Sequence, residues 1–146
     1  MSEFTLHPRL EADTIMLGRF PLSLLLLHKD ANYPWFILVP QRPGLTEIHQ
    51  LSDADRDQLM KESCQLAKAL EQLYSPDKLN LATIGNMVPQ LHFHHVVRFE
   101  SDPAWPAPIW GAVPAVEYEP GVMRQQIDEI CKVLMVGAFK PSSQIS

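Results

Sequence analysis

Apolar and polar stretches alternate along the first part of this chain. An almost continuous apolar run at residues 22–27 lies between Pro21 and a polar stretch at residues 28–32. The run is short for a helix and has polar flanks, so it predicts a buried strand. Residues 34–40 form a second apolar run with a proline at each end. The short link between the two runs predicts an antiparallel hairpin.

A helical period replaces this pattern from Ser52 onward. Ser52 and Asp55 form an acidic capping box, which is typical of a helix N-terminus. One long helix with a buried face is predicted over residues 53–75, because small or apolar side chains recur there at helical spacing. A short helix is predicted over residues 8–13, and a C-terminal helix is predicted to begin at Pro120.

Further strands are predicted over residues 14–20, 78–84 and 90–99. Short connections between strands favour antiparallel pairing. The sequence therefore predicts the α+β class, as an antiparallel sheet of about five strands with the long helix and a C-terminal helix on one face. Residues 1–140 are expected to form a single domain, and residues 141–146 a flexible C-terminal tail.

The last predicted strand carries a histidine-rich segment. Side chains alternate between the faces of a strand, so Gln90, His92 and His94 are expected on one face and His95 on the other. Imidazole is neutral near pH 7 and is basic enough to attack an electrophile or to accept a proton. Two imidazoles held side by side therefore predict a catalytic site with one nucleophile and one proton donor.

Composition and charge fit a globular protein. The chain is 46% hydrophobic and 20% charged, which is ordinary for a soluble domain, and its net charge of -5 gives no sign of a nucleic-acid-binding surface. The longest apolar run is too short to span a membrane, and the N-terminus lacks the apolar core of a secretory signal. Cys64 and Cys131 lack CxxC spacing, so they are expected to be buried free thiols in the cytoplasm.

The segment Gln90-Leu91-His92-Phe93-His94-His95-Val96 resembles the histidine triad (HIT) family, in which three histidines alternate with apolar residues. The order of elements over residues 10–110 is similar to that of HIT domains, and the proline-rich stretch at residues 102–106 looks like that of a bacterial subgroup. The resemblance implies a homodimeric nucleotide hydrolase or nucleotidyl transferase that acts at an α-phosphate. It places His92 as the nucleophile that forms a covalent nucleotidyl-histidine intermediate, and His94 as the third histidine, which assists the leaving group. Such a mechanism requires neither a metal nor a cofactor.

Gln90 stands where the family pattern has its first histidine. Its amide can donate and accept hydrogen bonds but cannot titrate, so the resemblance implies altered activity rather than none. Asp30 resembles an acidic ribose-binding position, and Asn86 resembles an asparagine on the substrate side. Both residues also suit turns, which is the alternative interpretation of each. His95 replaces an apolar residue and should face away from the site.

Two other functions remain open from the sequence. The chain could bind nucleotides without turnover, since Gln90 interrupts the triad. It could also be a metal protein, because His92 and His94 with Glu100 superficially resemble a cupin motif. No histidine follows His95 to supply the second cupin motif, and the helical patterns disagree with an all-β barrel.

Several residues near the segment have two interpretations. Arg98 is expected to meet a phosphate or to pair with Glu100. His28 is expected to be a structural histidine at the end of a buried strand. Residues 101–111 carry Trp105 and Trp110 among several prolines, and they are expected to pack as an ordered arm over the body or over a neighbouring subunit.

Overall fold

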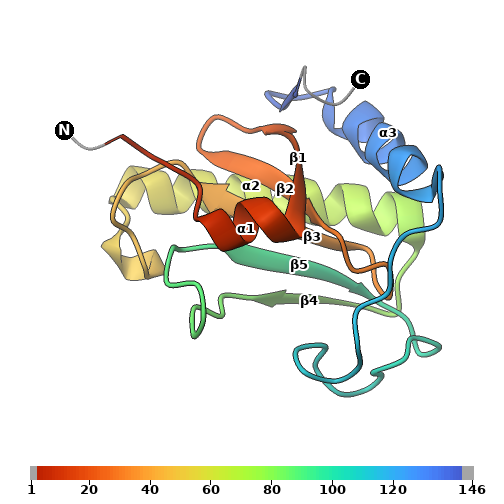
Figure 1. The fold of residues 1–146 in the computed structure, drawn as a ribbon. Coiled ribbons are helices and arrows are strands. Elements are labelled where there is room, and N and C mark those ends of the chain that lie inside the picture. Colours follow the sequence, from red (N-terminus) through yellow and green to blue (C-terminus); the bar gives the residue numbers. More distant parts are fainter. Residues whose placement is uncertain (1–2, 143–146) are drawn as a thin grey trace.

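A computed structural model describes residues 3–142 and contains one six-stranded sheet with helices on both faces (Figure 1). The strands lie in the order β4-β5-β3-β2-β1-β6, and neighbours are antiparallel throughout. The α+β class is therefore confirmed, with six strands in place of about five. In chain order the elements are α1 (Pro8–Asp13), β1 (Thr14–Arg19), β2 (Ser23–His28), β3 (Trp35–Pro40), the short 3-10 helix η1 (Ile48–Gln50), α2 (Asp53–Tyr74), β4 (Lys78–Ala82), β5 (Phe93–Arg98), α3 (Val122–Leu134) and β6 (Lys140–Pro141).

The ends of several predicted elements differ from the sequence pattern; for example, β4 ends at Ala82 rather than at residue 84, and α3 begins at Val122 rather than at Pro120. Strand β5 begins at Phe93 rather than at Gln90, because its pairing with β3 ends at the Leu38–Phe93 pair. Residues 140–141 pair with β1 as strand β6, and the amide of Ser142 donates to the carbonyl of Leu17, so the start of the predicted tail is part of the sheet. The remaining residues of that tail, 143–146, lie outside the described residues.

The sheet is buried on both faces. Leu25 and Leu27 of β2 lie in a core with α2 and α3, whereas Leu24 and Leu26 lie in a second core on the opposite face. That second face is covered by Leu10 of α1 and by the proline-rich arm (residues 101–111). The long helix α2 and the C-terminal helix α3 share one face, as predicted, whereas the short helix α1 covers the other face (Figure 1). Because both faces of the sheet are covered, β2 carries an uninterrupted run of leucines, at residues 24–27.

A buried ion pair fixes the proline-rich arm to the sheet. Arg98 of β5 is 1% exposed, and its guanidinium donates two hydrogen bonds to Asp102, at 2.8 and 3.1 Å. A third hydrogen bond, at 2.7 Å, reaches the side-chain oxygen of Asn80 in β4. The predicted pair with Glu100 does not form: Glu100 is exposed, and the turn after β5 returns Asp102 to the guanidinium instead. The arm is ordered over the body, as predicted.

The two cysteines are free, with Cys131 buried and Cys64 exposed. The expectation of two buried thiols is wrong for Cys64, which lies on the solvent side of α2 next to the buried Ser63. Within residues 3–142, no helix has the length and apolar character that crossing a membrane requires.

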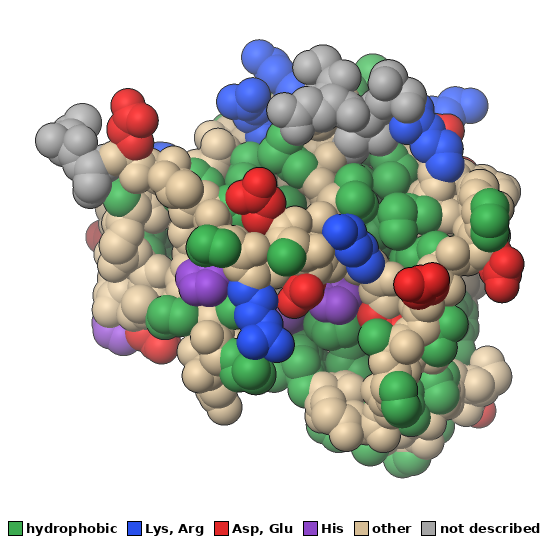
Figure 2. Space-filling view, in the orientation of Figure 1, with side chains coloured by type: hydrophobic (Ala, Val, Ile, Leu, Met, Phe, Trp, Pro, Cys, Tyr) green, Lys and Arg blue, Asp and Glu red, His purple; other side chains and the backbone are tan. Residues whose placement is uncertain are grey.

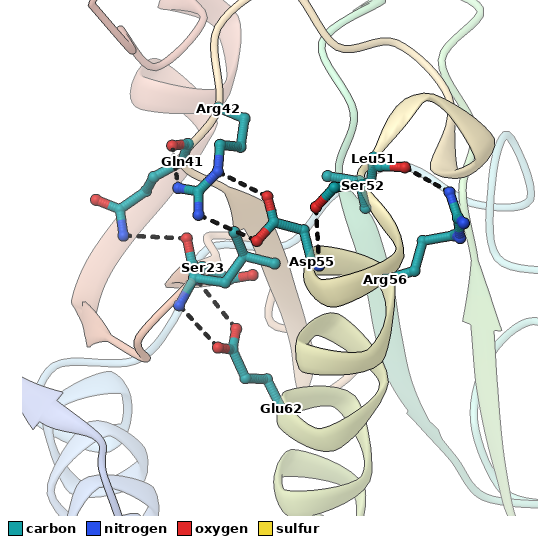
Figure 3. Close-up of polar contacts among 9 residues, drawn as sticks. Ser23, Gln41, Arg42, Leu51, Ser52, Asp55, Arg56 and Glu62 are labelled. Atoms are coloured by element: carbon teal, nitrogen blue, oxygen red, sulfur yellow. Dashed lines mark hydrogen bonds and ion pairs between the residues drawn. The ribbon is translucent and has the colours of Figure 1, made fainter.

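Buried Glu62 connects α2 to the turn between β1 and β2 (Figure 3). Its carboxylate accepts hydrogen bonds from the backbone amides of Leu22 and Ser23, at 2.8 and 3.0 Å. At the start of the same helix, the hydroxyl of Ser52 accepts from the amide of Asp55 at 3.1 Å, which is one half of the predicted capping box (Figure 3). The other half does not form, because the carboxylate of Asp55 accepts from Arg42. These contacts set the long helix against the strands.

Replacing Glu62 with alanine should destabilise the fold strongly. The change leaves two buried amides without acceptors, which costs about 3 kcal/mol of the free energy of unfolding. Urea unfolding measures this cost. The matched control is Glu71→Ala on the exposed side of α2, where we expect a change within about 0.5 kcal/mol. Equal changes in the two variants would contradict the role of Glu62.

Candidate active site

His92 and His94 lie side by side on the face of the sheet that α1 covers. Their ring centroids are 4.7 Å apart with the planes at 75°, and each residue is 5% exposed. Alternation along the segment therefore places these two rings together, as predicted. Both line one cavity of about 350 Å³. Figure 2 shows histidine side chains on this face of the molecule, among hydrophobic and charged ones.

This first cavity is mainly apolar. Helix α1 forms one wall, β3 and the end of β2 form its floor, and the β4–β5 loop and the arm close the other sides. Its lining residues other than the two histidines are Arg9, Leu10, Asp13, His28, Trp35, Ile37, Ile84, Asn86, Met87, Val88 and Trp110.

A second cavity of about 240 Å³ adjoins the first and is more polar. Thr46, Glu47 and Thr83 line it, together with Gln90. His92 lines both cavities, as do Ile84 and Asn86. His92 is therefore at the junction of an apolar and a polar compartment.

The backbone next to His92 fixes the position of its ring proton. Nδ1 of His92 lies 2.7 Å from the carbonyl oxygen of Gln90. A carbonyl oxygen can only accept, so Nδ1 carries the hydrogen in this bond. Burial lowers the pKa of His92, with the hydrogen bond to Gln90 acting in the opposite direction. The ring is thus neutral near pH 7, and the lone pair is on Nε2.

His94 is held by a tryptophan. The indole nitrogen Nε1 of Trp35 donates a hydrogen bond to Nδ1 of His94 at 2.9 Å. Burial first, and then the neighbouring His92, His28 and His95, together lower the pKa of His94 to about 3. His94 is therefore a neutral imidazole throughout the physiological range.

Two aromatic residues and a third histidine complete the site, and the sequence pattern did not assign them to it. His28 stacks on Trp35 with centroids 3.7 Å apart and the planes within 4°. The Trp110 ring lies edge-on to His94 at 5.1 Å. His28 was expected to be structural and Trp110 to pack. The register that places Trp35 opposite Val96 brings the indole beside His94, and the sequence carries no signal of that register.

His95 lies on the opposite face, as predicted. It is fully buried in contact with α2, and its Nε2 lies 2.7 Å from the hydroxyl oxygen of Ser63. Burial lowers the pKa of His95 to about 4, against the effect of the hydrogen bond to the carbonyl of Phe93. His95 is a core residue and takes no part in the site.

Gln90 connects the site to the N-terminal segment (residues 3–7). Its side-chain oxygen accepts from the amide of His7, and its side-chain nitrogen donates to the carbonyl of Thr5, both at 2.8 Å. Its own carbonyl accepts from His92. Gln90 therefore holds the N-terminal segment on one side and the His92 ring on the other.

The structure separates the two predicted nucleotide-binding residues. Asn86 is exposed and lines both cavities beside His92. Asp30 is buried and lines neither: its carboxylate accepts hydrogen bonds from the amides of Asn32 and Val116. Asp30 lines a neighbouring cavity of about 270 Å³, which shares His28 with the first cavity.

Within the described part of the chain, no group of three histidine, cysteine, aspartate or glutamate residues is arranged to hold a metal ion. The ring atom Nδ1 is already engaged in both His92 and His94.

The HIT domain family model matches residues 9–101 of this chain. A histidine triad protein from Bradyrhizobium japonicum is 41% identical, with 91% of this chain and 99% of that chain covered and a TM-score of 0.90. One from Marinobacter aquaeolei VT8 is 42% identical, with coverages of 92% and 98% and a TM-score of 0.89. One from Sinorhizobium meliloti 1021 is 37% identical, with coverages of 88% and 96% and a TM-score of 0.86. No curated protein matches the chain.

Replacing Gln90 with alanine should loosen the N-terminal segment. The variant loses the two hydrogen bonds to Thr5 and His7, so we expect amide exchange at His7 to accelerate about tenfold or more. Hydrogen exchange monitored by NMR measures this rate. Gln72→Ala, on the exposed side of α2, is the control and should leave the exchange of His7 unchanged. Wild-type exchange in the Gln90 variant would show that the segment is held by other contacts.

Proposed function

This chain belongs to the HIT domain family, and on that premise we propose that it is a nucleotide hydrolase or nucleotidyl transferase acting at an α-phosphate through a covalent nucleotidyl-histidine intermediate. One observation carries the proposal: the rings of His92 and His94 have centroids 4.7 Å apart in the apolar cavity, and His92 lies at the junction with the polar cavity. Both rings are neutral near pH 7, and the His92 ring keeps an unshared electron pair on Nε2.

The two cavities suit the two parts of a nucleotide conjugate. The apolar cavity, with Trp35 and Ile37 on its floor, accepts the nucleoside, since ligand sites combine apolar walls with a few polar groups. The polar cavity accepts the leaving group, with Asn86 in contact with both parts. The α-phosphate then lies beside His92. A ribose contact with Asp30 would require the ribose to extend into the neighbouring cavity, which Asp30 lines.

The reaction proceeds in two displacements. Nε2 of His92 attacks the α-phosphorus, a nitrogen–phosphorus bond forms, and the bond to the leaving group breaks with its electron pair on the leaving atom. Water, or another acceptor in a transfer, then attacks the phosphorus and releases His92. His94 donates a hydrogen bond to the phosphoryl group during both steps. Gln90 positions the His92 ring through its carbonyl and does not react.

Binding without turnover is the alternative function, and the observation that favours it is the amide of Gln90 in place of a titratable group. In the structure this side chain is engaged with the N-terminal segment, away from His94. The alternative predicts nucleotide binding with no monophosphate release and no covalent adduct.

His92→Asn should abolish the chemistry. Asparagine removes the nucleophile, so we expect a loss of at least about a thousandfold in monophosphate release and no adduct. The assay incubates each protein with an aryl ester of adenosine 5′-monophosphate and follows product release and intact mass. His49→Asn, at an exposed position in η1, is the control and should retain full activity. A His92 variant with the wild-type rate would refute the assignment, and a wild type that binds without release would support the alternative.

We also propose that the protein is a homodimer joined along β4, in the cytoplasm and with no nucleic acid or membrane as partner. Strand β4 is at an edge of the sheet, and its Leu81 is 45% exposed. Unpaired strand edges favour pairing with another chain.

Leu81→Lys should shift the chain from dimer to monomer, because a charged side chain opposes pairing at that edge. Light scattering coupled to size-exclusion chromatography measures the mass. Met135→Lys, at an exposed position directly after α3, is the control and should remain dimeric. A monomeric wild type would contradict the proposal.

A further inference from the structure

In the hydrogen bond between Trp35 and His94, only the indole of Trp35 can be the donor. An indole N–H can donate a hydrogen bond and cannot accept one. The 2.9 Å bond from Trp35 Nε1 therefore requires an unshared electron pair on Nδ1 of His94.

A ring that accepts at Nδ1 carries its single proton on Nε2. If Nδ1 of His94 were also protonated, its hydrogen would point at the indole hydrogen of Trp35. The hydrogen bond between the two residues would then be lost. Trp35 and His94 are 8% and 5% exposed, so water cannot readily replace the lost partner. Within the described residues, Nε2 of His94 has no hydrogen-bond partner in the protein, which leaves its N–H for a ligand.

We propose that Trp35 is a positioning residue, which keeps His94 as a neutral imidazole with its proton on Nε2. The role of that proton rests on the proposed function: the Nε2–H group donates to an oxygen of the α-phosphate while His92 attacks. Trp35 itself acts through His94.

The indole is held in turn by further contacts. His28 stacks on Trp35, and Nδ1 of His28 accepts a hydrogen bond from the amide of Asp30 at 3.0 Å. Trp110 lies edge-on to Trp35 with ring centroids 6.2 Å apart. A continuous chain of contacts therefore runs from the turn at Asp30 through His28 and Trp35 to His94.

The charged and titratable groups around His94 are consistent with a neutral ring. His92 and His28 line the cavity with it, and His95 follows it in β5. From α1, Arg9 and Asp13 reach the same cavity and form an ion pair with each other at 3.7 Å. No carboxylate accepts a hydrogen bond from His94 in the described structure.

The single ring proton of His94 also limits which kinds of leaving group the site can release. Giving up that proton would leave an imidazolate, a much stronger base than imidazole, so His94 donates a hydrogen bond without transferring the proton. When the bond between phosphorus and the leaving group breaks, its electron pair therefore goes to the leaving atom. Any proton that this atom needs comes from water. This favours weakly basic leaving groups, such as the oxygens of phosphate anhydrides and aryl esters, over amines.

The first experiment uses the wild-type protein labelled with ¹⁵N. We expect the His94 resonances near pH 7 to show a protonated Nε2 and an unprotonated Nδ1. We also expect a ¹⁵N–¹⁵N coupling across the hydrogen bond between Nδ1 and Trp35 Nε1. A protonated Nδ1, or equal amounts of the two tautomers, would overturn the proposal. This measurement requires no variant and no turnover.

The second experiment compares Trp35→Phe with Trp110→Phe. Each removes one indole N–H from the same cavity, and the N–H of Trp110 has no partner in the described structure. We expect Trp35→Phe to give a mixture of His94 tautomers and Trp110→Phe to keep the wild-type tautomer. A wild-type His94 spectrum in Trp35→Phe would overturn the proposal.

The catalytic part is tested with the aryl ester of adenosine 5′-monophosphate. Trp35→Phe should lower kcat about tenfold or more and change KM less than about threefold, because the loss is confined to the transition state. An unchanged kcat would overturn the catalytic role of the Trp35 bond. If the wild type has no turnover, the proposed function fails, while the NMR spectra still decide the tautomer.

Discussion

Alternation of side chains between the two faces of one sheet is the constraint on which the rest of this structure depends. At β5 it places His94 in the cavity under α1 and His95 in the core against α2. The neighbouring strand β3 follows the same rule, so that Trp35 lies on the His94 face and Phe36 in the core of the α2 face. Because both faces are covered, neighbouring residues in one strand have unrelated roles.

Burial makes the site imidazoles neutral, and fixed polar partners decide which nitrogen carries each proton. Desolvation lowers the pKa of His28, His92 and His94. The backbone carbonyl of Gln90 places the ring proton of His92 on Nδ1, and the indole of Trp35 leaves the ring proton of His94 on Nε2. None of these partners is a charged side chain. The two histidines are therefore oriented by fixed dipoles, which is the general condition for electrostatic preorganisation.

Gln90 has a structural role next to the histidine pair. Gln90 uses both atoms of its amide at once, as an acceptor from His7 and as a donor to Thr5. These two hydrogen bonds join the N-terminal segment to Gln90, whose backbone carbonyl orients the His92 ring. Helix α1, which follows directly, supplies Arg9, Leu10 and Asp13 to the wall of the apolar cavity.

The sequence by itself determined most of the helices and strands, the α+β class and the shared face of His92 and His94, because period and alternation are local properties of the chain. It also indicated that His95 faces away. It did not determine the partners of the site, because they come from strand register and from segments far apart in sequence. The pairing of β3 with β5 brings Trp35 to His94, and the turn after β5 brings Asp102, rather than Glu100, to Arg98. Only the tertiary structure could decide these contacts, since the composition of a segment does not state what packs against it.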